Sequence, residues 1–210
     1  MTTPSYTLYH SPLSQHARRV QALLEEASIA YEVHPIAIEK GGHMDPSYAA
    51  INPNRQLPTL VIDDEPLGES NAILRYLCNA HELHQWYPTD ARARARVDHW
   101  LDWNQCRLAD LVTQLVINVA ILGDKGDPKA IENSRTRLPP ILAILEQHLE
   151  GRSFVASDDH PTIADISIAT NITQLGFAQA APSDPNITRW YGTIASRPGF
   201  IASMPPAPGG

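Results

Sequence analysis

The sequence predicts an α/β N-terminal domain followed by an all-α helical domain. Over roughly the first eighty residues, short strand-like runs alternate with segments whose apolar residues recur every three to four positions. The stretch Trp86–Asp90 breaks this alternation, and beyond it the apolar residues follow the helical period alone. We therefore expect one domain over residues 1–82 and a second over residues 90–204.

The N-terminal domain is expected to follow the order β-α-β-α-β-β-α, which forms a small sheet flanked by helices. The dipeptide Ser11-Pro12 predicts a helix start, because proline suits the first helical turn. Another helix is expected to begin at Ser70, after an acidic turn that joins the last two strands. The strands are expected at residues 6–9, 31–35, 59–62 and 66–67, with a short helix at 46–51.

The helical domain is expected to begin with one long helix over residues 90–121. The next helix carries apolar residues over 138–149, but Pro139-Pro140 lies inside that pattern. An interior proline costs about 3 kcal/mol, so we expect a kink or a fresh helix start there. The segment Thr162–Asp165 has the composition of a capping box that opens a further helix, and a last helix follows residue 185.

The overall charge argues against a nucleic-acid partner. The formal net charge is −7 and the sequence pI is about 5.7. The densest basic stretch, Arg92, Arg94 and Arg96, alternates with alanine, so on a helix these side chains spread over a solvated face. No apolar run approaches the length of a membrane span, and we expect no membrane partner.

The cysteines indicate a reducing compartment. Cys78 and Cys106 both lie in helical patterns, form no CxxC pair and have no metal-ligand spacing. We therefore expect free thiols and no metal. A strand begins within a few residues of the start, which leaves no room for a secretory signal. The expected location is the cytoplasm.

The dipeptide Glu69-Ser70 is the most informative local feature. Ser70 has the chemistry of an N-cap, and the free N–H groups of a helix N-terminus can bind a carboxylate. Glu69 beside it can pair with an ammonium group. Both charges of an α-amino acid fit such a corner, so the pattern favours binding of a small zwitterionic peptide.

Five motifs occur in a characteristic order and spacing: Tyr6–Tyr9, Ser14–Val20, Asn52–Leu60, Trp86–Pro88 and Thr162–Ile166. Together they resemble those of cytosolic glutathione transferases, most closely the theta-like and bacterial serine-type members. The resemblance covers nearly the whole chain. It implies a thioredoxin-like N-terminal domain that binds glutathione, a helical domain that carries the electrophile site, and a homodimer. Glutathione would be a co-substrate and no metal would be needed.

The chemistry of such an enzyme requires a donor that stabilises the glutathione thiolate. A hydrogen bond to a charged group contributes about 1.5–3 kcal/mol, which lowers the thiol pKa by roughly one to two units. Ser14 is the first candidate, because serine-type members carry the catalytic hydroxyl in this Ser-Gln context. Ser11 and Tyr9 are alternatives, and a neutral His16 could instead act as a base.

The resemblance also assigns the contacts to the first half of glutathione. Glu69 and Ser70 would hold the γ-glutamyl ammonium and carboxylate. Leu57 would pair its backbone with the cysteinyl amides, in an antiparallel arrangement that a cis Pro58 makes possible.

The glycyl carboxylate would be held by His43 and Gln56. Theta-type members usually carry lysine where Gln56 stands, so the electrostatic attraction is weaker in this chain. Lys40 and Arg55 are close enough in sequence to compensate, and each fits equally well as a solvated loop charge.

The second substrate, a small hydrophobic electrophile, is expected against the long helix, between the two halves. Cys106 and Arg107 are candidates for the wall of an open pocket, although Arg107 is equally suited to a salt bridge with Asp110. The leading function is conjugation of glutathione. A glutathione-dependent dehalogenase or peroxidase is an alternative, and a non-catalytic glutathione-fold binding module is an alternative of another class.

Overall fold

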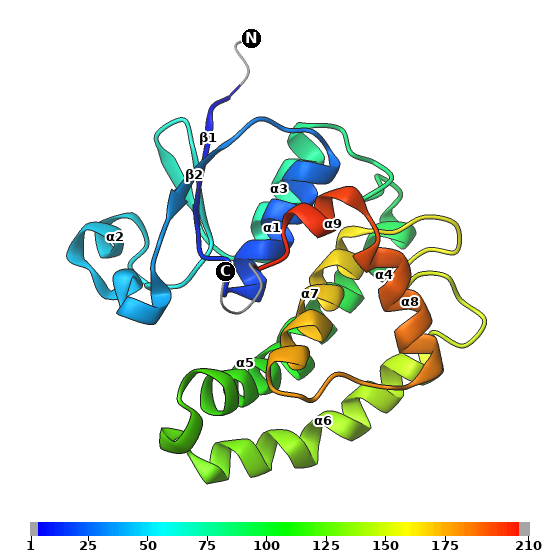
Figure 1. Cartoon of the computed structure of the whole chain (residues 1–210). Coiled ribbons are helices and arrows are strands. Elements are labelled where there is room, and N and C mark those ends of the chain that lie inside the picture. The colour runs from blue at the N-terminus through cyan, green and yellow to red at the C-terminus, as the bar shows by residue number, and fades with distance from the viewer. Residues whose placement is uncertain (1–3, 206–210) are drawn as a thin grey trace. The chain divides into compact units, whose positions relative to one another are not determined.

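The computed structural model describes residues 4–205, which form two compact units (Figure 1). The first unit consists of the residues up to Leu83 and of those from Ser196 onward. The second unit runs from His84 to Ala195. The first unit is α/β and the second is all-α, which confirms the predicted fold classes.

The first unit is built on a four-stranded sheet of order β2-β1-β3-β4. β2 runs parallel to β1, whereas β3 is antiparallel to both β1 and β4. The carboxyl ends of β1, β2 and β4 therefore meet the amino end of β3 at one edge of the sheet. The strands are β1 (Tyr6–His10), β2 (Glu32–Pro35), β3 (Thr59–Ile62) and β4 (Glu65–Leu67), close to the predicted ranges.

Helices cover both faces of this sheet. Along β1 the buried side chains alternate with half-exposed ones, as expected for a strand between two layers. α1 and α3 pack together on one side and α2 lies on the other (Figure 1). The helices are α1 (Gln15–Glu26), α2 (Pro46–Ile51), α3 (Ser70–Ala80) and α9 (Pro198–Ala202), with short 3₁₀ turns η1 (Ile38–Lys40) and η2 (Gly42–Met44).

The start of α1 differs from the prediction. The helix begins at Gln15, and Ser14 is its N-cap, with extended backbone and a side-chain oxygen that accepts from the amide of Ala17 at 3.3 Å. Residues before it form a turn that is closed by the bond from Ser14 N–H to the Ser11 carbonyl, 3.0 Å. Ser11 is therefore not the cap. Proline at position 12 is equally compatible with such a turn, because it fixes only φ.

The end of the chain also differs from the predicted domain boundary. Residues up to 204 were assigned to the helical domain, but α9 packs on α1 of the first unit. Arg197 Nε donates to Glu26 Oε2 at 2.9 Å, and the amide of Gly199 donates to Glu26 Oε1 at 2.8 Å. Gly199 itself approaches α1 so closely that a Cβ atom would lie 2.5 Å from the backbone nitrogen of Glu26.

The second unit opens with the predicted long helical run over 90–121. It consists of α4 (Ala91–Trp103), a π-helical turn η3 (Asn104–Ala109), α5 (Asp110–Val116) and a second π-helical turn η4 (Ile117–Ile121). A π turn inserts extra backbone into a helix and is frequent at functional sites. After the 3₁₀ turn η5 (Gly123–Lys125), the remaining helices are α6 (Pro128–His148), α7 (Ile163–Phe177) and α8 (Pro185–Ala195).

The double proline does not start a new helix. α6 runs unbroken over 21 residues with Pro139 and Pro140 inside it. Both prolines are exposed, as are Arg135 and Thr136, whose carbonyl groups lose their intrahelical partners. Water can hydrate those carbonyls, which keeps the helix intact.

α7 is the buried centre of the second unit, with every residue from Ile163 to Leu175 buried. The predicted capping box is confirmed: Asp165 accepts from both the amide and the hydroxyl of Thr162. The same carboxylate accepts from Val155 N–H and from Trp190 Nε1. Within residues 4–205, no helix has the length and apolar character needed to cross a bilayer.

Candidate active site

One edge of the sheet gathers most of the predicted site residues of the first unit. The register pairs Tyr9 with Thr59 and Leu60 with Leu67. The turn after β1, the cis peptide before β3 and the dipeptide after β4 therefore leave the sheet at the same edge. The segment that carries His43 also starts there, because the amide of Ile36 bonds to the His10 carbonyl at 2.8 Å.

Ser14 is positioned by the first turn of α1. As N-cap its oxygen accepts a hydrogen bond from the Ala17 amide, and its own O–H has no acceptor among the described residues. The side chain is half-buried. A hydroxyl at a helix N-terminus, with its proton available and positive dipole behind it, has the chemistry required to stabilise an anion.

The alternatives to Ser14 are held differently. Ser11 is only 1 % exposed, which leaves little room for a thiol beside its hydroxyl. The ring of Tyr9 stacks on His34, with 4.5 Å between ring centroids, and also contacts the Tyr48 ring on α2. Burial and the neighbouring Arg19 charge lower the pKa of His16 to about 3, so its imidazole is neutral at physiological pH.

The loop before β3 is fixed by two buried residues, Tyr48 and Asn52, to which the sequence motifs assign no role. The Leu57-Pro58 peptide bond is cis. Tyr48 OH donates to the Gln56 carbonyl at 2.6 Å, and Asn52 Nδ2 donates to the same carbonyl at 2.9 Å. Both groups also bond to the hydroxyl of Thr59. The Asn-Pro pair at 52–53 is the only local signal for this role, since it marks a turn.

Glu69 and Ser70 occupy the predicted corner, but each lies one position further into the helix than predicted. α3 begins at Ser70, so Glu69 stands in the N-cap place without a side-chain capping bond. Its φ of 61° is uncommon for a residue other than glycine and costs of the order of 1–3 kcal/mol. Backbone strain of this kind clusters at ligand sites. Ser70 is buried, and the Glu69 side chain is exposed.

The residues assigned to the glycyl carboxylate differ in exposure. His43 is partly buried in η2, and its Nδ1 atom is buried without a hydrogen-bond partner among the described residues. An unpaired buried nitrogen of this kind is costly. The side chain of Gln56 is exposed, as are Lys40 and Arg55.

Cys106 and Arg107 lie in the second unit, on the exposed side of the π turn η3. Beneath them the fully buried Asn104 donates to the Ser167 hydroxyl at 3.0 Å and accepts from Asn171 Nδ2 at 2.7 Å. This network ties the π turn to α7. No sequence pattern indicates this role of Asn104, because hydrogen bonds across 63 residues leave no local signal.

No group of three or more His, Cys, Asp or Glu side chains within residues 4–205 is arranged to hold a metal ion. The free cysteines are Cys78, which is buried, and Cys106, which is exposed. Burial raises the pKa of the Cys78 thiol to about 12, so this thiol is unreactive at neutral pH.

A small sheet with a cis proline at one edge, joined to a unit of helices, is the architecture of a glutathione transferase. Two family models match the chain: the glutathione S-transferase N-terminal domain over residues 8–85 and the C-terminal domain over residues 128–193. Glutathione S-transferase 3 of Zea mays is 32 % identical, over 96 % of this chain and 95 % of the relative. Glutathione S-transferase theta-1 of Mus musculus is 28 % identical, over 91 % of this chain and 83 % of the relative.

The chain belongs to the glutathione S-transferase family. A solved structure of a family member from Pseudomonas fluorescens pf-5, with two glutathione molecules bound, superposes with a TM-score of 0.85 at 26 % sequence identity. That comparison covers 96 % of this chain and 92 % of the other. The recognition made from the sequence motifs is thereby confirmed.

Proposed function

We propose that this protein is an enzyme that conjugates glutathione to small hydrophobic electrophiles, with Ser14 as the hydroxyl that stabilises the thiolate. The observation that carries the proposal is the convergence of Ser14, the cis Leu57-Pro58 bond and Glu69-Ser70 at one edge of the sheet. Its membership of the transferase family and the glutathione-bound relative support glutathione as the co-substrate.

The Ser14 hydroxyl donates to the glutathione sulfur, while its oxygen continues to accept the Ala17 amide. Because a free thiol titrates near 8.5, little of it is thiolate at neutral pH. A charge-assisted bond of about 1.5–3 kcal/mol moves that pKa down by roughly one to two units. The thiolate then forms a carbon–sulfur bond to the electrophilic carbon, either as a leaving group departs with its bonding electron pair or as the electron pair of an activated double bond shifts onto the activating group.

The rest of the tripeptide is held along the same edge. Glu69 pairs with the γ-glutamyl ammonium, and the free amides at the start of α3 with Ser70 take its carboxylate. The backbone of Leu57 pairs with the cysteinyl residue. His43 and Gln56 hold the glycyl carboxylate, as the family resemblance implies.

The electrophile contacts Cys106 and Arg107, whose exposed side chains stand on the π turn. We further propose a homodimer, as the family resemblance implies, and a reducing cytoplasmic location, in keeping with the two free cysteines.

The test is turnover of chlorodinitrobenzene by Ser14→Ala and Ser14→Gly. Glycine is tolerated at an N-cap at a cost of a few tenths of a kcal/mol, so it removes the hydroxyl with little effect on α1. Both variants are expected to lose roughly tenfold to a hundredfold in kcat/KM, and the pKa of bound glutathione, read from thiolate absorption, is expected to rise. Ser153→Ala, at an exposed serine of the other unit, is the control.

Undiminished turnover and an unchanged thiol pKa would show that Ser14 only caps the helix. Turnover restricted to haloalkanes or hydroperoxides would replace conjugation by the dehalogenase or peroxidase reaction at the same site. Retention on immobilised glutathione without any turnover would instead identify a binding module.

A further inference from the structure

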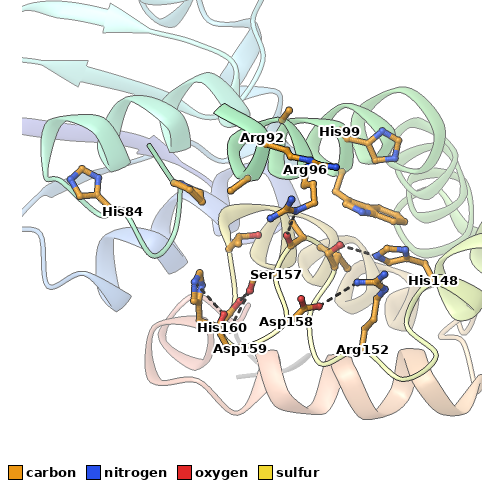
Figure 2. Close-up of a pocket in the computed structure, with 17 residues that line it drawn as sticks. His84, Arg92, Arg96, His99, His148, Arg152, Ser157, Asp158, Asp159 and His160 are labelled. Carbon is orange, nitrogen blue, oxygen red and sulfur yellow. Dashed lines mark hydrogen bonds and ion pairs between the residues drawn. The ribbon is translucent and has the colours of Figure 1, made fainter. Parts of the chain in front are cut away.

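A separate cavity of about 930 Å³ lies inside the second unit (Figure 2). The N-terminal half of α4 forms one wall, and the end of α6 with the segment 152–162 forms the other. Every residue that lines it belongs to the second unit, and none is among the residues proposed to bind glutathione or the electrophile. The cavity is therefore distinct from the proposed active site.

The walls carry an excess of positive charge. Arg92 and Arg96 stand one turn apart on α4, and Arg152 lies on the opposite wall. Figure 2 shows Arg96 reaching from α4 toward the 152–162 segment, where its Nε donates to the Ala156 carbonyl at 3.4 Å. Arg92 has no hydrogen bond or ion pair with any of residues 4–205.

The acidic residues of the cavity do not pair with Arg92 or Arg96. Asp158 pairs with Arg152 at 3.3 Å, and Asp159 lies 3.5 Å from His160 Nε2. Both carboxylates are largely exposed at the rim. Arg92 and Arg96 thus have no carboxylate partner among residues 4–205, although the formal net charge of the chain is −7.

The cavity also has a rigid apolar floor. Trp100 and Val155 line it and are only 6 % and 2 % exposed. His148 holds both of them, because its Nε2 atom bonds to the Val155 carbonyl at 2.8 Å and its ring lies 4.3 Å from the Trp100 ring. A ligand with one anionic end and one apolar body matches such a site.

We infer that this cavity binds a phosphate monoester of a small apolar body, with the phosphate on Arg92, Arg96 and Arg152 and the body on Trp100. A carboxylate offers two oxygens in one plane. A phosphate monoester offers three oxygens that point apart and carries nearly two negative charges at neutral pH. Guanidinium groups that approach from two opposite walls fit the second geometry, and the double charge offsets the repulsion between them.

The direct test is calorimetric titration with phenyl phosphate, with S-methylglutathione present at saturation so that the glutathione site is occupied. We expect phenyl phosphate to bind at least about tenfold more tightly than inorganic phosphate, which cannot use the floor, and than benzoate, which lacks the third oxygen. No binding of phenyl phosphate, or equal binding of either comparison compound, would overturn the inference.

The matched variants are Arg92→Ala/Arg96→Ala and Arg135→Ala/Arg137→Ala. Both remove two positive charges, but Arg135 and Arg137 are exposed on α6 and do not line the cavity. We expect the first pair to weaken phenyl phosphate binding at least about tenfold and the second to leave it within about twofold. Melting temperature and chlorodinitrobenzene turnover confirm that each variant is folded. Equal losses in both variants, or no loss in the first, would refute the site.

Discussion

Replacing Asp165 by alanine is expected to destabilise the second unit far more than the loss of an ordinary helix cap. The carboxylate is fully buried and accepts four hydrogen bonds of 2.8–2.9 Å. Alanine leaves the Thr162 amide, the Val155 amide and Trp190 Nε1 buried without an acceptor. Each orphaned donor costs about 1–3 kcal/mol, so a loss of roughly 3–5 kcal/mol in the free energy of unfolding is expected.

Asp127→Ala is the control, because Asp127 also caps a helix, α6, but is exposed and accepts one amide bond, from Lys129 at 2.9 Å. A loss of about 1 kcal/mol is expected there. Urea unfolding followed by circular dichroism measures both variants. Asp165→Asn, which keeps one acceptor oxygen, is expected to fall between them. If Asp165→Ala lost no more stability than Asp127→Ala, the reasoning from orphaned buried donors would be refuted.

Three further outcomes are expected. Gly199→Ala should lower the melting temperature, because its Cβ would meet the α1 backbone at 2.5 Å, and such overpacking costs about 1–3 kcal/mol. Burial and the charge of Arg18 lower the pKa of His10 to about 4, below its unfolded value of 6.5. As the pH drops, the imidazole is protonated in the unfolded state before it is protonated in the folded state. The free energy of unfolding should therefore fall by up to about 3 kcal/mol between pH 6.5 and pH 4, and a His10→Asn variant should lack this contribution to the pH dependence. Tyr48→Phe should raise KM for glutathione more than it lowers kcat, because it removes one of the two donors that hold the Gln56 carbonyl, and unchanged kinetics would contradict that role.

The four strands and α2 of the first unit were predictable because each has a local signal, whereas α9 was not predicted. The strands are short apolar runs bounded by turns, and α2 begins at a proline that follows its Asp45 cap. The start of α1 was not predictable in the same way. Ser11 and Ser14 are both good caps, and the choice between them depends on a turn closed by the Ser14 to Ser11 backbone bond.

The candidate site was predictable where family motifs carry it and not where tertiary contacts do. Tyr48 acts on the Gln56 carbonyl only because α2 folds back to the start of β3. From their spacing alone, the arginines of α4 were predicted to lie on a solvated helix face. Only the segment 152–162, some sixty residues away in the chain, converts that face into the wall of a cavity.

The return of α9 to α1 makes the first unit discontinuous along the polypeptide. During synthesis, Glu26 cannot pair with Arg197 until the 170 residues between them have been made. The first unit therefore reaches its final packing only after the helices of the second unit have been synthesised. For the same reason, a fragment that ends at Leu83 would lack α9, which covers α1. The two halves of this chain therefore cannot be exchanged with those of another protein by a single cut at residue 83.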